Sequence, residues 1–167
     1  MPLLTVEIIG KEQAVLQARM PEGGYIEYRD KYLTENGLYN EWREIYIKYV
    51  CLAKYGDIEA LKGAIFYVWL WYQVSEPGRF SDISELPDHG TQIVANILET
   101  YLSEGSMDDE LKQMLPYYII VCSYYFKCFY PLPHIQKASI MVEDLGRPKL
   151  VFSQWIYRGK MGEYWGE

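Results

Sequence analysis

Histidine is scarce in this sequence, and the motifs that carry much of enzyme chemistry are missing. The two histidines, His89 and His134, lie far apart, and each stands beside a helix start. The sequence has no glycine-rich phosphate loop, no Gly-x-Ser-x-Gly elbow and no histidine pair at helical spacing. A lone histidine in such a place is more often solvated or hydrogen-bonded than a metal ligand. The sequence therefore indicates no catalytic residue, no metal site and no cofactor.

Cysteine is also scarce, and the three that occur form no disulfide or zinc pattern. Cys51, Cys122 and Cys128 are odd in number, and none belongs to a Cys-x-x-Cys pair. On a helix, Cys122 and Cys128 would lie about 240° apart, so they would not share a face. The N-terminus lacks the basic segment and cleavage pattern of a signal peptide. We therefore expect reduced, buried thiols in a cytoplasmic protein.

No apolar run is long enough to cross a membrane. Residues 63–75 and 115–126 carry no formal charge, but a membrane span needs about 20 residues. Both runs also contain tyrosine together with glutamine or serine. This composition favours helices buried in a protein core over helices in lipid, and we expect no membrane association.

Positive charge is in deficit, with 16 Lys and Arg against 23 Asp and Glu, for a net charge of −7. Nonspecific binding to nucleic acid or to anionic lipid requires a basic surface, so the charge argues against both. A basic protein is a more suitable partner for an acidic chain than nucleic acid or anionic lipid. Solubility alone would also account for a mildly acidic composition.

Aromatic residues are abundant, and tyrosine leads them with 17 residues against 5 Trp and 5 Phe. Tyrosine combines a large apolar ring with a polar tip, so it suits a core edge, an interface or a ligand pocket. The chain has 167 residues, of which 50% are hydrophobic. This size fits one domain that buries roughly 70% of the surface of its unfolded chain. Self-association through tyrosines is one use of such a surface.

The segment 57–75 is predicted to be the central helix of the fold. Asp57 is suited to cap its N-terminus, and Glu59 places negative charge in the first turn, where the helix dipole favours it. Apolar residues then occupy every face of the helix. A helix that is apolar all round is buried, so we expect the other helices to pack around this one.

Hydrophobic periodicity and turn residues predict further helices on both sides of 57–75. The short connection before 57–75 predicts a helical hairpin with 38–55. Pro116 is expected to kink or divide the helix that follows a capping box of Ser106 and Asp109. The first segment, 3–9, fits either a strand or the start of a helix. The predicted helices cover about 11–20, 25–36, 38–55, 88–104 and 106–130.

The C-terminal part is less regular. From Ile135, a helix that ends at Gly146 competes with a strand, turn and strand over 139–156. Residues 158–167 hold three glycines with Tyr164 and Trp165, which indicates a flexible or docking tail after a domain of residues 1–157. The predicted fold is all-α, a compact single-domain bundle of six or seven helices, with a small β-hairpin near 139–156 as the open alternative.

The loop after the central helix is the candidate binding site. Glu76 opposes the helix dipole at a C-terminal end; Arg79 is close enough in sequence to form an ion pair with it, and Asp82 is close enough to share that arginine. Trp71 and Tyr72 are expected at its rim. A salt-bridged turn is the structural interpretation, and a small charged binding site is the functional one.

The function favoured by these features is non-enzymatic binding of a protein partner. An adaptor, or an immunity-type protein that neutralises a basic enzyme, fits the size and the acidic charge. The alternative is an enzyme or small-ligand-binding protein with a pocket at the C-terminal end of the central helix. No motif decides between them.

Overall fold

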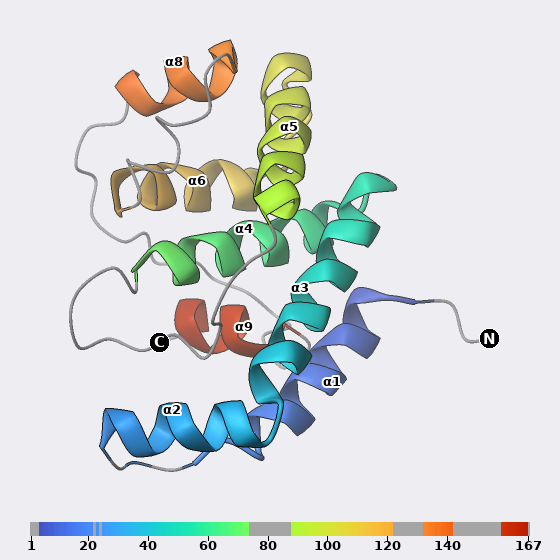
Figure 1. Ribbon diagram of the computed structural model, residues 1–167. Helices are drawn as coiled ribbons and strands as arrows, with labels where there is room; N and C mark the ends of the chain where they lie inside the picture. The colour runs from blue at the N-terminus through green and yellow to red at the C-terminus, as the bar shows by residue number, and fades with distance from the viewer. Residues whose placement is uncertain are drawn as a thin grey trace.

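The computed structural model describes residues 4–21, 23, 25–73, 88–121, 132–141 and 158–166. This part of the chain is helical and contains no strand, which confirms the predicted all-α fold. Residues 139–141 belong to a helix, so the first strand of the alternative hairpin does not begin there; residues 142–156 lie outside the described part. The helices are α1 (Val6–Gln17), α2 (Ile26–Glu35), α3 (Leu38–Lys54), α4 (Ile58–Gln73), α5 (Asp88–Glu104), α6 (Asp109–Val121), α8 (Pro133–Met141) and α9 (Gly159–Gly166) (Figure 1).

Local capping residues set several helix starts. The Thr5 hydroxyl accepts a hydrogen bond from the Ile8 N–H at 3.3 Å, and α1 begins at Val6. Of the two alternatives for residues 3–9, the start of a helix is therefore correct, whereas the predicted start near residue 11 is wrong. Asp57 caps α4 as predicted, because its carboxylate accepts from the Ala60 N–H at 2.9 Å. Asp108, and not the predicted Ser106, caps α6 by accepting from the Leu111 N–H at 2.8 Å.

Helix ends follow the predicted glycines. Gly37 and Gly56 have φ of 68° and 89°, a left-handed conformation that costs glycine little and ends α2 and α3.

The helix α6 continues through Pro116, so the proline does not divide it. Of the two predicted effects, a kink or a division, the division does not occur, since one missing N–H interrupts a single hydrogen bond while the flanking residues stay packed.

The predicted helical hairpin of α3 and α4 forms a large part of the core. Tyr67 of α4 lies among three rings of α3, with ring centroids 6.0 Å from Trp42, 6.2 Å from Tyr46 and 5.7 Å from Tyr49. The helices approach closely at Gly63, where a Cβ atom would lie only 2.7 Å from the Tyr49 ring. A side chain at this position would therefore push the two helices apart.

The helix α4 is the predicted buried helix. Every residue from Ala60 to Trp69 is buried, and α3, α5 and α6 pack against it. Figure 1 shows α4 between α6 and α9. Tyr164 of α9 lies with its ring 4.6 Å from that of Trp69, and the neighbouring Trp165 donates a hydrogen bond to the buried Tyr118 hydroxyl at 2.6 Å. The segment 158–166, considered a flexible or docking tail from sequence, thus contributes buried aromatic residues.

None of the described helices combines the length and the apolar character that a membrane span needs.

Candidate functional site

The loop proposed from sequence lies largely outside the described residues. Trp71 and Tyr72 belong to the last turn of α4, and their side chains are not described. Glu76, Arg79 and Asp82 fall in the segment 74–87, which is also outside the described part. The binding role of this loop therefore stays a prediction. The described residues offer other surfaces.

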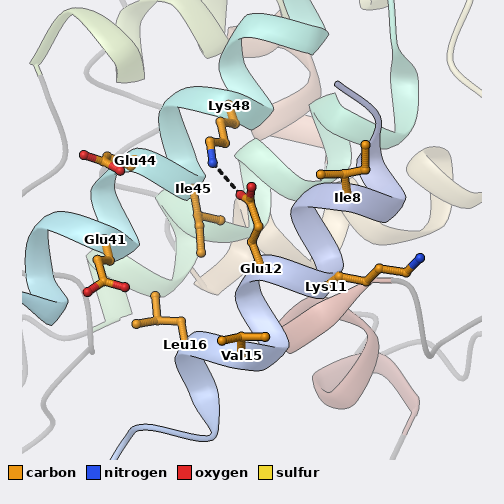
Figure 2. Close-up of a pocket in the computed structure, with 9 residues that line it drawn as sticks. All are labelled: Ile8, Lys11, Glu12, Val15, Leu16, Glu41, Glu44, Ile45 and Lys48. Atoms are coloured by element: carbon orange, nitrogen blue, oxygen red, sulfur yellow. Dashed lines mark hydrogen bonds and ion pairs between the residues drawn. The ribbon is translucent and has the colours of Figure 1, made fainter. Parts of the chain in front are cut away.

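A groove of about 410 Å³ runs between α1 and α3. Its apolar part comes from Ile8, Val15 and Leu16 of α1 and Ile45 of α3 (Figure 2). Val15, in the last turn of α1, is 65% exposed. The groove therefore presents apolar surface to solvent between two elements that the core holds in place. Its remaining lining residues are Lys11, Glu12, Glu41, Glu44 and Lys48.

Ion pairs across the two helices fix the charged rim of this groove. The Lys48 ammonium donates to the Glu12 carboxylate, which links α3 to α1 (Figure 2). At the other end, Arg19 donates to both carboxylate oxygens of Glu41, with one contact of 2.9 Å. The hydrogen bonding of its guanidinium to the Glu41 carboxylate is the main reason that the pKa of Arg19 is raised. The groove is thus bordered by charges of both signs.

The sequence contains a sign of this groove that the helix prediction did not use. In α1, apolar residues come in adjacent pairs, Ile8 with Ile9 and Val15 with Leu16. Adjacent helical residues point about 100° apart. Ile9 and Leu16 are buried, so their neighbours Ile8 and Val15 extend the apolar surface beyond the core.

A second groove of about 600 Å³ lies on the α5 side of α3. Ile93 of α5 forms one wall. Ile47 of α3 and Tyr55, which directly follows α3, are 48% and 87% exposed beside it. Cys51 is an exposed free thiol in this groove, so the expectation that all thiols are buried is wrong for this residue. Its position on the outer face of α3 keeps it away from the core. The other lining residues are Tyr46, Val50 and Lys54.

A cluster of charges around the buried Lys62 joins the N-terminal ends of α4, α6 and α9. The Lys62 side chain is only 1% exposed, and its ammonium lies 2.6 Å from carboxylate oxygens of both Glu59 and Asp108 and also contacts Glu110. The Arg158 guanidinium lies 2.7 Å from Glu59 and donates to Glu110. Burial lowers the pKa values of Lys62 and Arg158, but the carboxylates outweigh this effect and the net shifts are upward.

The carboxylates of Glu59, Asp108 and Glu110 could together hold a metal ion by their spacing, since ligand oxygens lie within 4.8 Å of one another. The Lys62 ammonium already contacts all three of them. A divalent cation would need the same oxygens and would face the repulsion of two fixed positive charges. The cluster therefore acts as a structural connection between helices, and sequence analysis did not foresee it.

His134, one of the two histidines weighed from sequence, has a structural role. The Glu99 carboxylate of α5 accepts hydrogen bonds from the backbone N–H groups of His134 and Ile135, each at 2.9 Å. The His134 Nδ1 atom lies 2.7 Å from the same carboxylate. Glu99 thus caps α8 from another helix, and His134 is hydrogen-bonded as expected for a lone histidine at a helix start. His89 lies in the first turn of α5, and its side chain is not described.

Comparison with known proteins yields no relative for this arrangement. No protein-family model matches the chain, and neither the curated proteins nor the solved structures include a significant match. The function is therefore argued from the surfaces themselves.

Proposed function

We propose that the chain is a non-enzymatic domain that binds a protein partner through the groove between α1 and α3. The observation that supports this proposal is the 65% exposure of Val15, an apolar residue that lines that groove. An apolar side chain in an open groove with a charged rim suits the apolar anchors of a partner. The rim then supplies polar contacts around the anchored residues.

The partner we propose presents an amphipathic segment with basic flanks. Three of the five charged residues that line the groove are the glutamates Glu12, Glu41 and Glu44. Lys48 and Arg19 engage the first two, which leaves Glu44 exposed to receive a cation. The net charge of −7 attracts a basic protein over a longer range. An adaptor or an immunity-type protein that masks a basic enzyme has this chemistry, and we place it in the cytoplasm, where Cys51 stays reduced.

Affinity capture from a lysate of the source cells tests this function. Three tagged proteins are compared at moderate salt, the wild type, Val15→Asp and Ala14→Asp, and the retained proteins are identified by mass spectrometry. Ala14 is exposed on the same helix but does not line the groove, so it controls for the added charge. The proposal requires a stoichiometric partner that is lost only with Val15→Asp. Equal recovery with all three proteins would contradict a role for the groove.

A further inference from the structure

Two ion pairs connect α1 with α3 along the groove and fix the register of the two helices. Glu12 pairs with Lys48, and Arg19, just beyond α1, pairs with Glu41. The step of seven residues from Glu12 to Arg19 runs forward along the chain, whereas the matching step from Lys48 to Glu41 runs backward. The two helices therefore run antiparallel, and the groove follows their length.

The helix α1 contributes two apolar side chains to the groove at this same interval. Ile8 is partly buried and Val15 is exposed, and both line the groove. Because they are seven residues apart, they lie on one side of α1, about 10.5 Å from one another along its axis. Glu12 lies between them along α1, and its ion pair with Lys48 crosses the groove (Figure 2). The groove thus offers two apolar positions separated by a polar one.

This spacing distinguishes between the backbone conformations that an occupant could have. In a helix, residues seven apart lie on the same side, about 10.5 Å from each other. In an extended strand, residues on the same side are two or four apart, which separates them by about 6.6 or about 13 Å. A helix therefore matches the interval between Ile8 and Val15, and a strand does not.

Charges at the two edges of the groove define the flanks of such a helix. Lys11 on the α1 edge and Glu44 on the α3 edge are exposed, and neither forms an ion pair with another residue in the described part of the chain. Figure 2 shows the two side chains on opposite sides of the groove, pointing away from each other. A helix seated between them would have a cation along one flank and an anion along the other.

We propose that the partner element is an amphipathic helix that packs as a third helix against α1 and α3. This inference rests on the proposed function and names the structure that the partner presents. The apolar anchors of the helix recur every seven residues, and a polar residue four positions after an anchor meets the Glu12–Lys48 ion pair. The flank toward Lys11 is acidic, and the flank toward Glu44 is basic.

Synthetic peptides test the proposal without the natural partner. The probe is a fluorescein-labelled peptide of three heptads, with leucine every seventh residue, glutamine four residues after each leucine, lysine on one flank, glutamate on the other and alanine elsewhere. One control has the same composition in an order that spreads the leucines over all faces. A second control carries a central proline, which breaks the helix. Fluorescence anisotropy should give the probe a dissociation constant about tenfold below those of both controls.

Variants of the full chain locate the bound probe. Ile8→Asp and Val15→Asp should each weaken its binding about tenfold, because each places a charge at one anchor position. Ala14→Asp, which does not alter the groove lining, should bind the probe as the wild type does. Lys11→Glu makes both edges acidic, so this variant should prefer a probe with lysine on both flanks. Circular dichroism confirms that each variant folds.

Three results would overturn the helix. One is a probe that binds no more tightly than its controls, or does not bind at about 1 mM. Another is an Ile8→Asp variant that binds the probe as the wild type does, which would leave a single anchor. The last is a Lys11→Glu variant with unchanged flank preference. The proposed function fails on different evidence, since it requires a natural partner that Val15→Asp loses. A partner lost with Val15→Asp but retained by Ile8→Asp would preserve that function and contradict the helix.

Discussion

The Lys62 ammonium of α4 lies 2.6 Å from the Asp108 carboxylate, the same side chain that caps α6. One carboxylate therefore orders a helix start and balances a buried cation. Glu59 and Glu110 complete the surroundings of Lys62, and Arg158 pairs with both of them from the start of α9. These ion pairs thus connect α4, α6 and α9 with one another.

Replacing Lys62 with Met should strongly destabilise the protein. The apolar stem remains, but Glu59, Asp108 and Glu110 lose the charge of Lys62. Because Arg158 still pairs with Glu59 and Glu110, we expect a loss of about 3 kcal/mol, the lower end for a broken buried ion pair. Denaturant unfolding followed by circular dichroism measures the change. Lys112→Met is the control, because Lys112 and Asp109 form an exposed pair, for which about 0–1 kcal/mol is expected. Equal losses in the two variants would show that the cluster contributes no more than a surface pair.

Trp165→Ala should release α9 from the core. The substitution removes a buried ring and the hydrogen bond to the Tyr118 hydroxyl, at a cost of about 3–5 kcal/mol. Limited proteolysis should then cleave the C-terminal segment sooner than in the wild type. Tyr25→Ala removes an aromatic side chain that is exposed and should leave both stability and cleavage unchanged. If the Trp165 variant resists protease as the wild type does, the packing of α9 does not hold the segment.

Gly63→Ala should destabilise the hairpin of α3 and α4, although alanine is the better helix former. The new Cβ atom would meet the buried Tyr49 ring at 2.7 Å, and such overpacking costs about 1–3 kcal/mol. A double-mutant cycle with Tyr49→Leu checks the cause. When the ring is removed, the Gly63→Ala change should become neutral or stabilising. An unchanged penalty in the Tyr49→Leu background would assign it to something other than this contact.

Glu99→Gln should weaken the docking of α8 in a pH-dependent way. Burial raises the pKa of Glu99, but the hydrogen bonds from His134 and Ile135 outweigh it and the net pKa is lowered. A lowered carboxylate pKa contributes stability above the unfolded value of about 4.3, and that stability is lost as the pH falls through the folded value. At pH 7 the variant should lose about 1–2 kcal/mol. The difference from wild type should shrink as the pH falls below about 4.3, and a constant difference across this range would contradict the assignment.

Local features of the sequence were sufficient to predict most helix limits and the buried helix. Asp57, Gly37 and Gly56 act on their own neighbours, so their effects are visible in a short stretch of sequence. The apolar faces of 58–73 likewise indicate burial without knowledge of the partners. These predictions held because capping and hydrophobic burial depend on residues that are close along the chain.

The sites could not be predicted because they depend on how distant helices pack. Lys62 pairs with Asp108, and Glu59 with Arg158, only after α6 and α9 reach the N-terminal end of α4. A lysine in the middle of an apolar helix was the available signal, since burial of such a charge requires counter-charges nearby. The exposure of Val15 depends in the same way on the packing of α1 against α3. The predicted loop site at 76–82 lies outside the described residues, and mutation of Arg79 remains its test.

The most direct test of the central claim is the affinity of the captured partner for wild-type protein and for the two α1 variants, measured by titration calorimetry. The account predicts that Val15→Asp weakens binding at least tenfold, because it places a charge among the apolar anchors, while Ala14→Asp binds as the wild type does. Equal dissociation constants for all three proteins would contradict binding in the groove between α1 and α3.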